Sequence, residues 1–131
     1  MNYSDRVRDH FTAPRNLGEI AHPDGIGDVH NPVCGDRAVL TIRVREGRIA
    51  KACFRAQGCP TAIAASSITT ELLIGCTLEQ AALLTNEDVA EALGVLPANK
   101  LHCSVLAEDV IQAALGDYHS RVPAAATAAA R

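Results

Sequence analysis

The sequence predicts an α+β fold in which helices pack on one face of an antiparallel sheet. Residues 37–56 alternate between apolar and polar side chains around a tight turn, which is the pattern of a β-hairpin. From Gly58 to about Tyr118 the spacing of the apolar residues is helical instead. Because the strands precede the helices, the order of the elements predicts helices packed on one face of an antiparallel sheet.

The N-terminal region is expected to hold one short helix and one short strand. Val7 and Phe11 are four residues apart and should share the apolar face of a helix that Pro14 ends. Residues 15–36 are rich in Gly, Pro, Asp and Asn, which predicts an irregular segment. Within that segment a short strand is expected near 26–29.

The hairpin should consist of strands over 37–45 and 49–56, joined by a tight turn at Glu46 and Gly47. One face of the hairpin is expected to be buried and the other wet, because the apolar residues alternate along each strand. The residues expected on the buried face are Leu40, Ile42, Val44, Ala50, Ala52, Phe54 and Ala56.

Capping signals mark the first helices after the hairpin. Pro60 suits the first turn of a helix, where its missing N–H is not needed, and that helix should end near Gly75. Thr77 and Gln80 have the spacing of a capping box ahead of a short apolar run. These signals predict two consecutive helices with a break between them.

Two further helices complete the expected fold. Asn86 is expected to cap a helix over 87–93, which Gly94 terminates. The last helix should run over about 100–118 with an apolar stripe on one side. The stripe is expected to contain Leu101, Val105, Ala107, Ile111 and Leu115.

Composition limits both the organisation and the function of the chain. With 131 residues the chain is long enough for one domain with a buried core, which we place at 1–120, followed by an Ala-rich disordered tail over 121–131. A net charge of −3 and an aromatic content of 3% argue against a nucleic-acid binder. The N-terminus lacks the apolar stretch of a signal peptide, and no apolar run approaches the roughly 20 residues of a membrane span. We therefore expect a cytoplasmic protein with free thiols.

Three of the five cysteines stand where a thiol would be reactive. Cys34 precedes Gly35 in a stretch without helix or strand pattern, and Cys59 follows Gly58 at the start of an expected helix. Cys103 stands near the start of the last helix. The N–H groups and partial positive charge of a helix N-terminus favour a thiolate. The spacing contains no zinc-finger pair, so only the tertiary fold could bring the three thiols together.

If the three thiols converge, they form a site for a soft metal or an iron–sulfur cluster. Asp36 and His102 are then candidate fourth ligands, because each neighbours one of the cysteines in sequence. A structural zinc site or a stable electron-transfer cluster usually has four strong ligands. Three thiols leave one exchangeable position, which suits a site that loads and unloads its cargo.

Other interpretations of the same residues remain open. Cys59 or Cys103, each taken alone, could be a buried structural cysteine, and we assign Cys53 and Cys76 to packing. A Cys–His hydrolase built on His102 and Cys103 is disfavoured, because adjacent helical residues point about 100° apart. Asp36 and Arg37 could be a solvated pair. The remaining histidines are interpreted as ordinary loop or surface residues: His10, His22, His30 and His119.

At these residues the chain resembles the U-type iron–sulfur cluster assembly scaffolds, IscU and the N-terminal domain of NifU. The resemblance extends to about Tyr118 and rests on several motifs in the same order, which makes it specific. The matching segments are 6–11, 14–18, 31–36, 58–59 with 62–67, and 101–109.

The resemblance implies a three-stranded antiparallel sheet with helices, and a non-enzymatic scaffold that builds a [2Fe-2S] cluster from Fe²⁺ and sulfur. Cys34, Cys59 and Cys103 would hold the cluster, and Asp36 and His102 would complete or tune the site. Cys103 would be the main persulfide acceptor. A vacant three-thiol site also binds Zn²⁺ readily, so the apo form can hold zinc.

The implied partners are a cysteine desulfurase, a ferredoxin or other electron donor, and apo iron–sulfur acceptor proteins. Two segments depart from the family pattern. Pro60-Thr61 replaces the Gly-Ser that is more usual after the second cysteine. Residues 96–100, Leu-Pro-Ala-Asn-Lys, only partly match the Leu-Pro-Pro-Val-Lys motif recognised by the specialised Hsp70 chaperone. The use of Hsp70 and J-type chaperones is therefore left open.

Two rival functions use the same residues. A zinc-dependent sulfurtransferase of the SufU type would hold Zn²⁺ on Cys34, Asp36, Cys59 and Cys103 and prime a thiol for sulfur transfer. The chain lacks the insertion that such proteins carry between the second and third cysteines, which favours the IscU type. A purely structural zinc protein is the third possibility.

Overall fold

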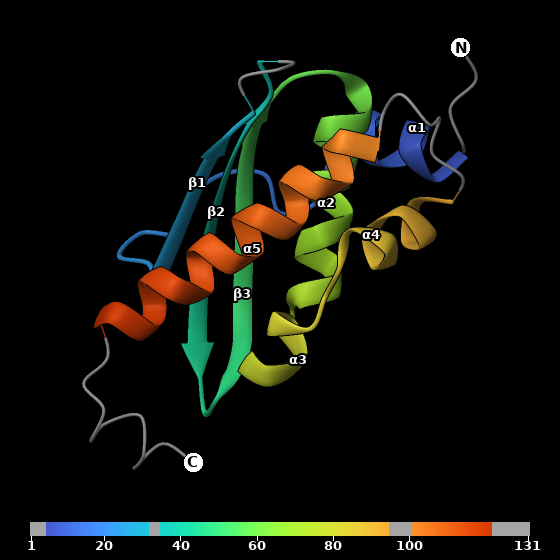
Figure 1. Ribbon diagram of the computed structural model, residues 1–131. Coiled ribbons are helices and arrows are strands. Elements are labelled where there is room, and N and C mark those ends of the chain that lie inside the picture. Colours follow the sequence, from blue (N-terminus) through green and yellow to red (C-terminus); the bar gives the residue numbers. More distant parts are fainter. Residues whose placement is uncertain (1–4, 32–34, 95–100, 122–131) are drawn as a thin grey trace.

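The structure is a computed structural model that describes residues 5–31, 35–94 and 101–121, without the side chains of 101–105. Helices lie beside and across a small sheet in this part of the chain (Figure 1). In chain order the elements are α1 (Asp5–Thr12), β1 (Gly25–His30), β2 (Arg37–Arg45), β3 (Arg48–Gln57), α2 (Pro60–Leu73), α3 (Leu78–Ala82), α4 (Asn86–Leu93) and α5 (Leu101–Arg121). The predicted α+β fold is confirmed. The expected tail over 121–131 lies almost entirely outside the described residues, and the domain boundary stays a prediction.

The sheet has the strand order β1-β2-β3, and both neighbouring pairs are antiparallel. The strand expected near 26–29 is β1, and the hairpin strands are β2 and β3. A β-bulge interrupts the hairpin, because Val44 pairs with Ile49 while Arg43 pairs with Lys51. Ala50 is the extra residue of the bulge and is exposed, and Ile49 takes the buried position. The expectation that Ala50 lies on the buried face was therefore wrong.

The opposite face of the sheet is not fully wet, contrary to the expectation. Thr41 and Cys53 lie on that face and are only 3% and 8% exposed. The segment that follows α1 covers them: the Gly18 N–H donates to the Phe54 carbonyl at 2.8 Å, and the Ile20 N–H donates to Thr41 Oγ1 at 3.1 Å. This segment has no helix or strand period, so the sequence pattern did not indicate that it packs on the sheet.

The main core lies between the sheet and α5, which crosses the face of the sheet in Figure 1. Its buried residues are Ala38, Leu40, Ile42, Ile49, Ala52, Leu73, Ala81, Leu106, Val110, Ile111, Ala114 and Leu115. Ala107, Ile111 and Leu115 are buried, as their place in the stripe predicts. The side chains of Leu101 and Val105 lie outside the described residues.

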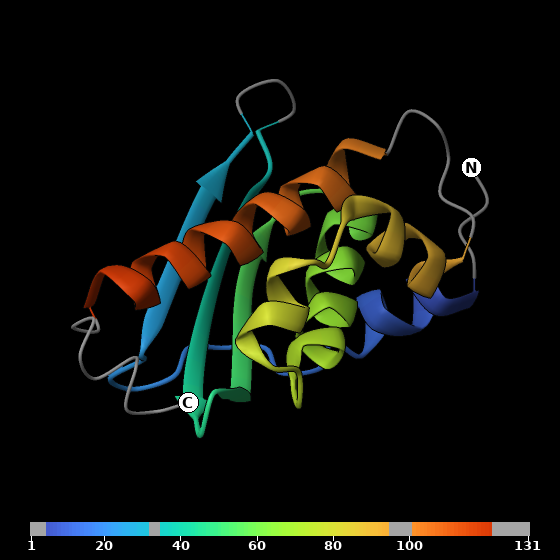
Figure 2. The same cartoon turned by 60° about the horizontal axis from the view of Figure 1, so that its bottom comes forward.

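A second apolar cluster joins four helices on the side of α2 away from the sheet strands. Its buried residues are Val7, Ala64, Ala65, Ile68, Val89, Leu93 and Ala107. They come from α1, α2, α4 and α5. Through Ala107, this cluster fixes the first part of α5 against the first part of α2. Both helices begin at the same end of the molecule (Figures 1 and 2).

The buried partner of Val7 on α1 is His10, and not Phe11 as expected. Phe11 is 41% exposed, whereas His10 is 4% exposed. His10 Nδ1 lies 2.7 Å from Ser67 Oγ, and its Nε2 lies 3.3 Å from Glu71 Oε1. The interpretation of His10 as a surface histidine was wrong, because its hydrogen-bonding partners on α2 are distant in sequence. His22, His30 and His119 are exposed, as expected.

The capping signals were largely informative. Thr77 and Gln80 form a reciprocal capping box at the start of α3, with bonds of 3.1 and 3.0 Å. At α4 the N-cap is Thr85 and not Asn86, because the Thr85 side chain forms a capping box with Asp88. The described residues contain no helix that is both long enough and apolar enough to span a membrane.

Candidate functional site

The five candidate site residues differ in how far the structure describes them. Cys34 lies outside the described residues. His102 and Cys103 belong to the first turn of α5, but their side chains lie outside the description. Asp36 and Cys59 are described in full. The geometry of the site is therefore built from Asp36, Cys59 and the backbone elements around them.

Asp36 is the residue before β2 and is buried, with 4% of its surface exposed. Backbone hydrogen bonds join the end of β1 to the start of β2: the Asn31 N–H donates to the Asp36 carbonyl at 2.7 Å, and the Gly35 N–H donates to the Asn31 carbonyl at 2.8 Å. Gly35 has a φ of 78°, which favours glycine. Asn31, Gly35 and Asp36 are thus held together by backbone hydrogen bonds, and Asp36 places a buried carboxylate where β2 begins.

The carboxylate of Asp36 lies against Gly58, one residue before Cys59. Arg37 pairs with Gln57 at the end of the β2–β3 ladder. Asp36 and Gly58, the residues just beyond this pair, therefore lie side by side. A Cβ atom on Gly58 would overlap Asp36 Oδ1 and lie 2.7 Å from Asp36 Cγ, and Gly58 has a φ of 154°. A side chain at position 58 would therefore force the Asp36 carboxylate to shift. The structure thus brings the candidate ligands Asp36 and Cys59 together from different parts of the sequence.

Cys59 is the N-cap residue of α2, and Pro60 occupies the first turn, as predicted. Its backbone is extended, with φ −73° and ψ 166°, and its side chain does not cap the helix. The thiol is partly exposed and is not in a disulfide. The first turn of α2 carries no acidic residue. Since the first N–H groups of a helix lack intrahelical partners, this end of α2 can bind an anion such as a thiolate-held cluster.

The first turn of α5 lies at the same end of the molecule as Asp36 and Cys59. Ala107 of α5 packs in one cluster with Ala64 of α2. One helical turn before Ala107 is Cys103, and about one turn before Ala64 is Pro60. Because both helices begin at this end (Figures 1 and 2), the backbone places the first turn of α5 next to the N-terminus of α2.

The other two cysteines lie away from this end. Cys53 is buried in the middle of β3 opposite Thr41. Cys76 follows the C-terminus of α2, and its Sγ donates to the Leu72 carbonyl at 3.0 Å. Both positions agree with packing roles. Within 5–31, 35–94 and the described part of α5, no three His, Cys, Asp or Glu side chains form a metal-binding group.

Arg37 is paired with Asp28 and not with Asp36. Arg37 Nε and Nη2 donate to the two carboxylate oxygens of Asp28 at 2.9 and 2.6 Å. This ion pair lowers the pKa of Asp28 and raises that of Arg37. The solvated Asp36–Arg37 pair considered from sequence was wrong, because Arg37 turns toward the neighbouring strand while Asp36 is buried.

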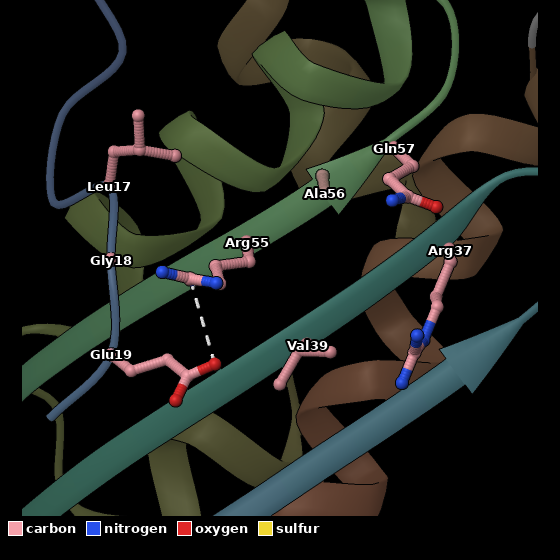
Figure 3. A pocket seen from close by; sticks show the side chains of 8 residues that line it. All are labelled: Leu17, Gly18, Glu19, Arg37, Val39, Arg55, Ala56 and Gln57. Atoms are coloured by element: carbon pink, nitrogen blue, oxygen red, sulfur yellow. Dashed lines mark ion pairs between the residues drawn. The ribbon is translucent and has the colours of Figure 1, made fainter.

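Two open clefts on the sheet were not indicated by the sequence. One, of about 590 Å³, adjoins the candidate site and is lined by Asp28, His30, Gly35, Arg37 and Gln57. The other, of about 460 Å³, is drawn in Figure 3, where the segment of Leu17, Gly18 and Glu19 runs beside β3. In it, Arg55 and Glu19 form an ion pair of 3.5 Å. Their side chains come from segments without a shared sequence motif, so no pattern could have predicted either cleft.

Comparison with known proteins gives the family. The model of the NifU-like N terminal domain matches residues 2–125. The iron–sulfur cluster assembly scaffold protein IscU of Azotobacter vinelandii is 50% identical over 122 residues, covering 90% of this chain and 94% of that protein. IscU of Escherichia coli K12 is 47% identical over 125 residues, covering 92% and 97%. IscU 1 of Archaeoglobus fulgidus is 51% identical over 116 residues, covering 88% and 76%.

Two solved structures share the fold at low sequence identity. A NifU-like N-terminal protein from Brucella abortus matches with a TM-score of 0.72 at 15% identity, covering 90% of this chain and 94% of that chain. A putative scaffold protein for the SUF system from Fervidobacterium islandicum matches with a TM-score of 0.72 at 18% identity, covering 86% and 96%. The family match over residues 2–125 and the IscU relatives at about 50% identity show that this chain belongs to the NifU-like N-terminal domain family, which includes the IscU-type iron–sulfur cluster assembly scaffolds.

Proposed function

We propose that this protein is a non-enzymatic scaffold on which a [2Fe-2S] cluster is assembled and then passed to apo-proteins. One observation carries the proposal beyond the family: Asp36 lies against Gly58, beside Cys59 at the N-terminus of α2. Asp36 and Cys59, from different segments of the sequence, therefore lie at the same end of the molecule, where α5 also begins (Figure 1). This arrangement supports a ligand site assembled by the fold.

The donor set suits a cluster that is held for a limited time. Cys34, Cys59 and Cys103 would supply thiolates, which are strong ligands for iron. Asp36 would supply a hard oxygen ligand, and His102 an imidazole, as the exchangeable fourth position. A carboxylate binds iron of a cluster less strongly than a thiolate does. The mixed set would therefore hold the cluster during assembly and still allow its release.

Sulfur would reach the site as a persulfide on Cys103. The Cys103 thiolate attacks the terminal sulfur of the desulfurase persulfide, so that a new S–S bond forms on Cys103 and the desulfurase cysteine leaves as a thiolate. The transferred sulfur is at the level of S⁰, and its conversion to sulfide requires two electrons. A ferredoxin or similar electron donor would supply them. The proposed partners are thus a cysteine desulfurase, an electron donor and apo iron–sulfur proteins.

A zinc-dependent sulfur acceptor is the second candidate. The structural likeness to a SUF-system protein keeps it in consideration. In that case Zn²⁺ would occupy Cys34, Asp36, Cys59 and Cys103, and the protein would pass on a persulfide without building a cluster. The close relatives named IscU favour the first candidate.

Single Cys→Ser variants test the ligand assignment. Anaerobic reconstitution with Fe²⁺, cysteine, a desulfurase and a reductant should give the absorption of a [2Fe-2S] cluster in the parent protein. Cys34→Ser, Cys59→Ser and Cys103→Ser should each fail to retain it, because a hydroxyl is a poor ligand for iron in a cluster. Cys76→Ser is the matched control, since a hydroxyl can still donate to the Leu72 carbonyl. Equal loading of all four variants would contradict the proposal.

A further inference from the structure

Helix α2 buries an unusual number of hydroxyl groups, and nearly all of them are hydrogen-bonded. The buried hydroxyl residues are Thr61, Ser66, Ser67, Thr69 and Thr70. Ser66 donates to the Ala62 carbonyl at 3.0 Å and Thr69 to the Ala65 carbonyl at 2.6 Å. Thr70 donates to the Ser67 carbonyl, and the Ser67 hydroxyl bonds to His10 and to the Arg15 N–H.

Thr61 is the exception. Thr61 is 0% exposed, and its Oγ1 has no hydrogen-bond partner. Among the described residues, Arg15 Nη1 is the only other buried side-chain nitrogen or oxygen without a partner. The reason is the position of Thr61 in the first turn of α2. The residue four positions earlier, Gln57, belongs to β3, so no helix carbonyl lies one turn back to accept from Thr61. A buried hydroxyl without an acceptor is unfavourable and rare in native proteins.

The helix period shows where this hydroxyl lies. Thr61, Ala64, Ala65 and Ile68 share one face of α2, and the last three pack in the cluster that contains Ala107 of α5. Thr61 is one turn closer to the start of α2 along that face. Side chains on a helix tilt toward its N-terminus. Thr61 therefore lies at the N-terminal end of the α2–α5 contact, two residues after Cys59.

We propose that the Thr61 hydroxyl is a positioning group that donates a hydrogen bond to an anionic sulfur atom of the bound cargo. The acceptor would be a cluster sulfide, a ligating thiolate or a persulfide at the site. This inference rests on the proposed scaffold function. Hydrogen bonds to the sulfur atoms of a cluster stabilise it and tune its reduction potential. Without cargo the hydroxyl lacks an acceptor, so the same residue should destabilise the empty protein and stabilise the loaded one.

The opposite effects on empty and loaded protein make the inference testable. Thr61→Val removes the hydroxyl at nearly constant shape, and Thr61→Ser keeps it. Thr69→Val is the matched control on the same helix, because Thr69 is equally buried but already donates to the Ala65 carbonyl. In the metal-free protein, Thr61→Val should raise the melting temperature by about 3 °C or more. Thr69→Val should not raise it.

In the cluster-loaded proteins the effect of Thr61→Val should be reversed, so that the substitution destabilises the bound cluster. We expect the reconstituted cluster of Thr61→Val to decay at least threefold faster than that of the parent, and its Fe–S stretching frequencies in resonance Raman spectra to shift. Thr61→Ser and Thr69→Val should match the parent in both measurements. The Raman shift is informative even where decay rates are close, because a hydrogen bond to a sulfur atom changes the Fe–S bonds directly and Thr61→Ser, which keeps the hydroxyl, should restore the parent frequencies.

Two failures can be told apart. If the parent takes up no iron and sulfide, the proposed function is wrong and this inference falls with it. If the parent loads normally and Thr61→Val has the same frequencies and the same decay rate, the inference alone is overturned. A lower melting temperature of metal-free Thr61→Val would also overturn it, because the hydroxyl would then have an acceptor within the protein.

Discussion

Gly27 of β1 lies directly against the backbone of α5, and an alanine at this position should separate the two. A Cβ atom on Gly27 would overlap the Val110 carbonyl oxygen, lie 2.7 Å from the Ala114 amide nitrogen and lie 3.2 Å from the Ala113 Cβ. The first two atoms belong to the helix backbone, so no side-chain rotation relieves the contact. Helix α5 would have to move outward by about 1 Å.

The expected cost follows from this overlap. Overpacking of a core costs about 1–3 kcal/mol, and a clash with backbone belongs at the upper end. Alanine gains back about 0.5–1 kcal/mol, because it loses less conformational entropy than glycine on folding. The net loss of about 1–2.5 kcal/mol should lower the melting temperature of a domain of this size by roughly 4–10 °C.

Gly116 provides the matched control on the same helix. No atom lies within 4 Å of a Cβ added to Gly116. Gly116→Ala should therefore stabilise α5 by about 0.5–1 kcal/mol through its higher helix propensity. Thermal unfolding followed by circular dichroism should show opposite shifts for Gly27→Ala and Gly116→Ala. An equal rise in melting temperature for both would refute the close packing of β1 on α5.

Three further predictions concern the site and its supports. Gly58→Ala should displace the Asp36 carboxylate and weaken Co²⁺ binding about tenfold or more in a competition titration, and unchanged affinity would contradict the Asp36–Gly58 contact. Asp36→Ala should load a cluster but release it more slowly in a transfer assay, and an unchanged transfer rate would show that Asp36 is not a ligand. Burial, helped by the charge of Arg15, lowers the pKa of His10, so the unfolded chain binds its proton more readily than the folded chain. Urea unfolding should therefore show full stability above about pH 6.5 and a loss as the pH falls below it, and an identical pH dependence in His10→Gln would contradict this assignment.

The sequence predicted those elements of the fold that depend on residues close together in the chain. The alternation over 37–56 predicted the hairpin, and the capping residues Thr77 and Gln80 predicted the start of α3. The bulge at Ala50 could not be predicted, because Ile49, Ala50 and Ala52 are all apolar and the pattern is equally consistent with two registers. Local patterns fix which residues alternate, but pairing across the strands decides which of them are buried.

The same distinction applies to the site and to His10. Gly58 and Pro60 predicted that Cys59 begins a helix, and the structure confirms it. The contact between Asp36 and Gly58 depends on the register of β2 and β3, which the sequence did not indicate. His10 was assigned to the surface because its partner Ser67 is distant in sequence. Counted from Val7, His10 at i+3 and Phe11 at i+4 fit the same helix face equally well, so the spacing did not decide which of them is buried. The convergence of Cys34, Cys59 and Cys103 stays a prediction.

The scaffold proposal is tested most directly by measuring metal and acid-labile sulfide in the protein after strictly anaerobic purification. A scaffold for a [2Fe-2S] cluster should contain iron and sulfide in equal amounts, and both should be lost together in Cys59→Ser. Anaerobically purified protein that contains zinc without iron or sulfide, and that takes up neither on reconstitution, would contradict the proposal and favour the zinc-dependent sulfur acceptor.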